Sequence, residues 1–119
     1  REQYSEWVFH SILKEDDPKR GKLESILYEF AGAKKTIDKG AMLERMAVAG
    51  VRGEEAESYV NLLCDIGFLG IQTADGFRYS QHEEERHTMR EVARRRAKAA
   101  GKQERFEINA AFYHVLQID

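Results

Sequence analysis

Apolar residues between Asp38 and Ile66 recur at intervals of three and four, which is the spacing of one face of a helix. Asp38 is a good N-cap residue for a first helix, which Gly50 ends. A second helix is expected from about Glu54 to Ile66, and Gly67 ends it. Its apolar residues share a face: Ala56, Tyr59, Val60, Leu63 and Ile66. The pattern therefore predicts two amphipathic helices joined by a short turn.

Two short runs after these helices, 68–73 and 77–80, contain the aromatic and β-branched residues typical of strands. We expect residues 74–76 to form a three-residue loop, because that register pairs Ile71 with Tyr79 and brings apolar residues together. Helix, helix and hairpin is the order of a winged helix-turn-helix. The predicted fold class is thus mainly α with a small antiparallel β-hairpin, a winged helix-turn-helix with extra N- and C-terminal helices.

The part of the chain before this pattern divides in two. We expect residues 1–17 to be a helix or linker from an upstream domain, because the chain does not begin with methionine and is expected to be part of a longer polypeptide. Asp17 and Pro18 mark the start of the winged-helix core, residues 18–80, since aspartate caps a helix and proline suits its first position. A short strand at 35–37 is expected beside the hairpin.

Residues 81–119 are expected to extend the same domain. A long helix from about Glu83 to Ala100 is acidic in its first turns and basic in its last, which complements the helix dipole. A short strand is expected at Arg105–Ile108, and Asn109 can cap a final helix. The long helix carries only a narrow apolar stripe: Met89, Val92, Ala93, Ala97 and Ala100. It is therefore expected to pack lightly or against another protein.

Composition limits the class of protein. The chain has 119 residues, of which 42% are hydrophobic and one is proline, so a single folded domain is expected. The formal net charge of −2 does not indicate nucleic-acid binding by the domain as a whole. No stretch approaches the roughly 18 apolar residues of a membrane span, and no secretory leader is recognisable. Cys64 is the single cysteine and is expected to be a small core residue, which fits a cytoplasmic protein.

The second predicted helix carries an acidic and polar outer face. In a helix-turn-helix this helix enters the major groove of DNA, where lysine and arginine provide most of the affinity for the phosphate backbone. The outward positions here are Glu54, Glu57, Ser58, Asn61 and Asp65. Carboxylates at these positions repel phosphates. We therefore predict that this face contacts a protein.

Basic residues gather elsewhere. On one side of the long helix they recur every four residues, and two more lie in the turn and the wing: Arg86, Arg90, Arg94, Lys98, Arg52 and Arg78. One interpretation of the helix stripe is a solvated face partly paired with nearby acids. The sharper interpretation is a surface for an acidic partner or a phosphate backbone. A third is that this positive flank meets the negative face of another copy, giving a homo-oligomer.

Motifs for catalysis or metal binding are weak. Residues 32–36 resemble the end of a phosphate-binding loop but follow a helix and lack the first glycine of that motif. His82 and His87 are five residues apart, whereas zinc-binding histidines on a helix are four apart. No nucleophile elbow or isolated acid–base pair is present. The prediction is that this chain is not itself an enzyme and holds no cofactor or metal.

Three segments resemble the C-terminal region of bacterial P-loop ATPases of the STAND- or AAA-like kind. These segments are Leu23–Phe30, Val60–Gly70 and Arg105–Phe112. Asn109 and Ala110 depart from the histidine–proline pair expected at that place. The resemblance implies that a nucleotide-binding domain precedes a winged-helix region, which has a regulatory or assembly role beside it. The residues of the phosphate loop itself have no counterpart in this chain.

Two functional hypotheses follow. The first is a non-catalytic winged-helix accessory domain of a larger P-loop ATPase, with the upstream ATPase domain or another protein subunit as its partner. The alternative is a DNA-binding winged-helix transcriptional regulator that uses the wing and the basic long helix. A small enzyme would be a third class, but the residues support it least.

Overall fold

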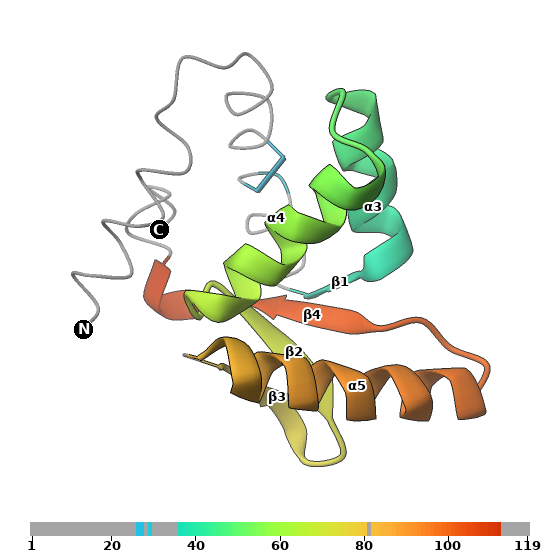
Figure 1. The fold of residues 1–119 in the computed structure, drawn as a ribbon, viewed down its shortest axis with the longest axis vertical. Helices are drawn as coiled ribbons and strands as arrows, with labels where there is room; N and C mark the ends of the chain where they lie inside the picture. The colour runs from blue at the N-terminus through green and yellow to red at the C-terminus, as the bar shows by residue number, and fades with distance from the viewer. Residues whose placement is uncertain (1–25, 28, 30–35, 81, 113–119) are drawn as a thin grey trace.

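The computed structural model describes residues 26, 27, 29, 36–80 and 82–112. Their helices and strands follow in the order β1 (Thr36–Asp38), α3 (Lys39–Val48), α4 (Gly53–Asp65), β2 (Leu69–Thr73), β3 (Gly76–Arg78), α5 (Glu83–Ala99), β4 (Arg105–Ile108) and the 3₁₀ turn η1 (Ala110–Phe112). The architecture is a small four-stranded antiparallel sheet with helices packed against it (Figure 1). The sequence predicted strands in all four places, but it did not predict that the strand at Arg105–Ile108 joins the hairpin in one sheet.

Parts of the predicted fold lie outside the described residues. These are the N-terminal segment 1–17, most of the helix expected after Pro18, and the part of the final helix expected beyond Phe112. Ile26 and Leu27 are helical and buried, as the pattern of that helix predicted. Asn109 does act as a cap, because its Oδ1 accepts a hydrogen bond from the amide of Ala111 at 3.0 Å.

The sheet has the strand order β1-β4-β2-β3, which differs from the expected arrangement. The short strand before α3 does form, but it pairs with β4, where Ile37 lies opposite Phe106. β4 in turn pairs with β2, where Ile71 lies opposite the same Phe106. The expectation that the strand at 35–37 lies beside the hairpin is thus wrong. β4, which follows α5 in the sequence, lies beside the hairpin instead. The neighbouring strands β2 and β4 are therefore separated in the sequence by β3 and the whole of α5.

The predicted register of the β2–β3 hairpin is also wrong. Thr73 pairs with Gly76 and Ile71 with Arg78, so the loop has two residues rather than three. Ile71 finds its apolar neighbour on β4 instead of on β3. Tyr79 covers Gly70: a Cβ added at that glycine would lie 2.7 Å from the tyrosine ring. The Tyr79 hydroxyl donates a hydrogen bond to Glu107, which lies opposite Gly70 on β4.

The hydrophobic core lies on one face of the sheet, as alternation along the strands requires. α3, α4 and α5 contribute Met42, Met46, Val60, Leu63 and Ala93, and the strands contribute Ile37, Leu69, Ile71, Phe106 and Ile108. Phe68 and Phe112 close one end with an edge-to-face contact, their ring centroids 5.3 Å apart. Cys64 is fully buried in this core, which confirms its structural role. Among the described residues, no helix is long and apolar enough to cross a membrane.

Candidate functional site: a charge network between α4 and α5

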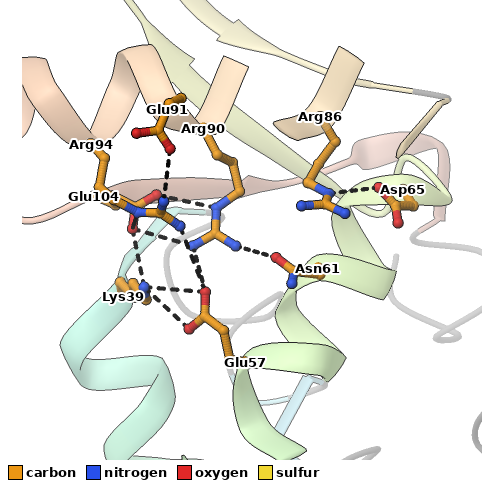
Figure 2. Close-up of polar contacts among 9 residues, drawn as sticks. All are labelled: Lys39, Glu57, Asn61, Asp65, Arg86, Arg90, Glu91, Arg94 and Glu104. Atoms are coloured by element: carbon orange, nitrogen blue, oxygen red, sulfur yellow. Dashed lines mark hydrogen bonds and ion pairs between the residues drawn. The ribbon is translucent and has the colours of Figure 1, made fainter. Parts of the chain in front are cut away.

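The outer face of α4 meets α5, and the two helices present polar residues at the same spacing. The basic residues of α5 are spaced four residues apart, at Arg86, Arg90 and Arg94, so their side chains project from one side of the helix. Glu57, Asn61 and Asp65 of α4 are likewise four residues apart. Figure 2 shows the two rows pointing toward each other. A periodic row of carboxylate and amide side chains thus lies against a periodic basic row of the same molecule.

The two rows run antiparallel, so the end of the α4 row contacts the beginning of the α5 row. Arg86 donates from Nε to Asp65 at 2.8 Å, at one end of the interface. Arg90 donates from Nη1 to the side-chain oxygen of Asn61, and its Nη2 lies 3.0 Å from Glu57. These contacts tie about one turn of α5 to about two turns of α4.

Arg90 and Glu104 form the centre of the network. The Arg90 side chain is 1% exposed and that of Glu104 is 6% exposed. Nε and Nη2 of the arginine reach the two carboxylate oxygens of Glu104, each at 3.2 Å. This is the bidentate geometry in which arginine binds carboxylates most strongly. The guanidinium also lies over the ring of Phe106, 5.5 Å from its centroid, so the pair rests on the apolar core.

Lys39 completes the network from the start of α3. Its Nζ lies 3.2 Å from Glu57 and 3.2 Å from Glu104. Its backbone amide donates to the carbonyl of Glu104 at 2.9 Å. Arg94 approaches both carboxylates from the solvent side, at 3.9 Å from Glu57 and 3.7 Å from Glu104. The two buried or half-buried carboxylates are therefore surrounded by three cations (Figure 2).

The electrostatics of the network favour its charged state. Burial alone would raise the pKa of Glu104, but the hydrogen bonds and charge of Arg90, with Lys39, outweigh it and hold the pKa below its usual range. The pKa of Glu57 is lowered for the same reason, as Arg90 and Lys39 outweigh its burial. Burial would lower the pKa of Arg90, yet Glu104 and Glu57 raise it. All three groups are thus ionised at neutral pH.

The structure divides the predicted protein-contact face. Glu57, Asn61 and Asp65 turn toward α5 and are half-buried, so the expectation that they form an outward face is wrong for these three. α5 covers them. Glu54 and Ser58 are exposed, as expected.

The predicted basic surface is divided in the same way. Arg86 and Arg90 are buried at 9% and 1% exposure, so they do not lie on a solvated or ligand-facing surface. Arg94 lies at the solvent edge of the network, and 47% of its side chain is exposed. Lys98 is exposed and forms no ion pair with any residue that the structure describes.

The remaining predicted basic positions lie apart from this interface. Arg52 is exposed, and its Nε donates to the carbonyl of Ala47. Arg78 on the hairpin is exposed and lies 4.0 Å from Asp75. The structure therefore does not gather Arg52, Arg78 and the α5 stripe into one surface through contacts with each other.

Lys39 and Glu104 were missed at the level of sequence. The four-residue spacing of opposite charges on two amphipathic helices was a usable signal that the two rows meet each other. No comparable signal marked Lys39 or Glu104. Lys39 and Glu104 lie close together because β1 pairs with β4. In that pairing Asp38, which precedes Lys39, lies opposite Arg105, which follows Glu104.

The chemistry of this network is structural. Each carboxylate in it faces at least one cation, and the central groups are covered by protein. Within the described residues, no group of three or more histidine, cysteine, aspartate or glutamate side chains is placed to hold a metal ion. No family model matches this chain, and no curated protein or solved structure matches it either.

Proposed function

We propose that this chain is a non-catalytic winged-helix domain of a larger P-loop ATPase, which makes protein contacts rather than reading DNA. The order α3, α4, β2, β3 supports a winged-helix relationship, although β4 takes the place beside β2. The resemblance of three segments to bacterial STAND- or AAA-like ATPases supports the larger context. In this proposal the protein acts in the cytoplasm, and its partner is the ATPase domain or another subunit.

The observation that carries the proposal is the position of Arg90. Its guanidinium is buried between Glu57 and Asn61 of α4 and Glu104. α5 is thereby attached to the face of α4 that would have to enter a major groove. A helix covered in this way cannot bring its side chains to base edges. Of the predicted contact positions on α4, Glu54 and Ser58 stay exposed to a partner, and they suit a protein surface better than phosphates.

Two experiments test the proposal. The first is sequencing of the reading frame upstream of Arg1. A Gly-rich phosphate loop in that region would support the ATPase context, and its absence would contradict it. The second is fluorescence anisotropy with duplex DNA over a range of salt concentrations. We expect no nanomolar affinity. Salt-sensitive nanomolar binding that is lost in the Arg52→Ala/Arg78→Ala variant would overturn the proposal.

The alternative is a DNA-binding regulator, and one observation favours it. The C-terminal half of α5 remains basic and exposed, and neither Lys98 nor Arg96 forms an ion pair with any described residue. For this alternative, Arg96→Ala and Lys98→Ala should weaken DNA binding and flatten its dependence on salt. Arg90→Ala is unsuitable for this test because Arg90 is buried. Unchanged binding in the two surface variants would exclude the alternative.

A further inference from the structure

A cavity of about 210 Å³ lies between the C-terminal half of α5, the loop after it and the end of β2. Its lining includes Arg96, Ala97, Ala100, Lys102, Glu104 and Arg105. Three residues of the predicted apolar stripe that line the cavity, Ala93, Ala97 and Ala100, have short side chains that leave this space unfilled. The volume is below the roughly 300 Å³ at which pockets for drug-sized molecules begin. The cavity therefore suits a small group.

The wall of the cavity is held in place by backbone contacts. Gly101 has φ +68° and ends α5 in the left-handed conformation, and its amide donates to the carbonyl of Lys98. The amide of Lys102 donates to the carbonyl of Ala97 at 2.7 Å. These two bonds are the pattern of a Schellman motif, which fixes the chain as it leaves the helix. Lys102 is thus positioned by the fold.

The other side of the loop is fixed by Gln103. Its Oε1 accepts a hydrogen bond from the amide of Gly40 at 2.7 Å, at the start of α3. Glu104 follows and is anchored in the Arg90 network. The loop is therefore tied to α5 at one end and to α3 and the sheet at the other.

The charge of the cavity lining is unbalanced toward positive. Arg96 and Lys102 line it, and neither forms an ion pair with any residue among those described. The carboxylate of Glu104 is neutralised by Arg90, Lys39 and Arg94. Arg105 differs from the first two cations, because it is paired with Asp38 and bonded to Thr36. Two cations with no ion-pair partner in the described part of the chain thus remain at one small cavity.

We infer that this cavity binds a single phosphate group of a small ligand, with Arg96 and Lys102 as its cationic contacts. Arginine offers paired donors to phosphate oxygens, and lysine adds a point charge. The shared chemistry is a phosphate dianion, free or as a monoester. This binding site is independent of the proposed protein-contact role.

The test is a titration of the ¹⁵N-labelled 119-residue chain with inorganic phosphate, at ionic strength matched with sodium chloride. We expect saturable amide shifts concentrated at Ala97, Gly101, Lys102 and Gln103. Arg96→Gln and Lys102→Gln should each raise the dissociation constant about tenfold, the usual effect of losing one charge-assisted contact. Lys98→Gln is the matched control: it removes the same charge from the same helix end, outside the cavity, and should change affinity less than about twofold. Circular dichroism and thermal melting confirm that each variant is folded.

A second variant removes space while keeping every charge. Ala97→Leu places a larger side chain in the cavity and should abolish saturable binding. Ala100→Leu, at an exposed position of the same lining, repeats the test if Ala97→Leu does not fold. Non-saturating shifts, an equal loss in Lys98→Gln, or full binding in the leucine variants would each overturn the inference.

A parallel titration with a mononucleotide and with duplex DNA distinguishes the source of the phosphate. Binding of inorganic phosphate and of the mononucleotide with the same dependence on Lys102 supports the inferred site. Binding of duplex DNA alone, weakened equally by Lys98→Gln and Lys102→Gln, would show a diffuse basic surface and overturn it.

Discussion

Arg90 and Glu104 are bonded through two parallel contacts of 3.2 Å, although α5 ends between them in the sequence. Both side chains are nearly buried, at 1% and 6% exposure. Breaking a buried pair by removing one partner leaves an uncompensated charge, at a cost of about 3–5 kcal/mol. This pair therefore determines how α5 sits on the rest of the molecule.

Arg90→Ala should lower the free energy of unfolding by about 3 kcal/mol, the low end of that range because Lys39 still faces Glu104. Urea denaturation followed by circular dichroism measures it. Arg95→Ala is the matched control on the same helix, since the Arg95 side chain is 79% exposed and its ion pair with Glu91 is long, at 4.0 Å. Its effect should stay within about 0.5 kcal/mol. Equal effects of the two variants would contradict the structure.

Asp65→Ala should destabilise the protein by about 1–3 kcal/mol, because it leaves the buried Arg86 without its closest acceptor. Glu54→Ala, on the same helix, should change stability by less than about 0.5 kcal/mol because Glu54 is exposed. The two variants separate the covered and accessible parts of the predicted face. The measurement is again the urea midpoint. A neutral Asp65→Ala would show that α5 does not lie on α4 in this way.

Gly70→Ala should cost about 1–3 kcal/mol, the range for overpacking, because the new Cβ would lie 2.7 Å from the ring of Tyr79. Thermal unfolding gives the size of the effect. The same change in a Tyr79→Ala background should cost much less, since the ring is then absent. A penalty that is the same in both backgrounds would argue against the hairpin register observed here.

Stability should fall in acid as the network is protonated. The pKa values of Glu57 and Glu104 are lower in the folded chain than their usual value of 4.5. The unfolded chain therefore binds protons first, so the stabilisation is complete above about pH 5 and is lost as pH falls through the lowered folded values. Urea midpoints from about pH 6 to pH 3 measure the decline. Glu104→Gln should flatten it, and an unchanged slope would contradict the assignment.

Cys64 should resist thiol reagents while the protein is folded. Burial raises its pKa to about 12, so at pH 8 only roughly one molecule in ten thousand would carry the thiolate. Labelling with a chromogenic disulfide should be complete in denaturant and very slow in its absence. Rapid stoichiometric labelling of the native protein would mean that α4 opens readily.

Local patterns in the sequence were sufficient for the elements themselves. The periodicity of Val60 and Leu63 predicted α4 and its buried face, and both side chains are in the core. The strand at Arg105–Ile108 and the cap at Asn109 were also predicted, because each depends on a few neighbouring residues. Even the four-residue spacing of the charged rows was visible.

Which of these surfaces meet depends instead on how the elements pack together. Ile71 could not be assigned its neighbour Phe106 from the sequence, because strand pairing across the length of α5 leaves no periodic trace. The acidic row of α4 and the basic row of α5 looked like two surfaces for outside partners, yet they pair with each other around Arg90. Helix periodicity is a short-range property of the backbone, so the chain alone determined it. The order of the strands and the pairing of distant charges depend on how the whole core packs.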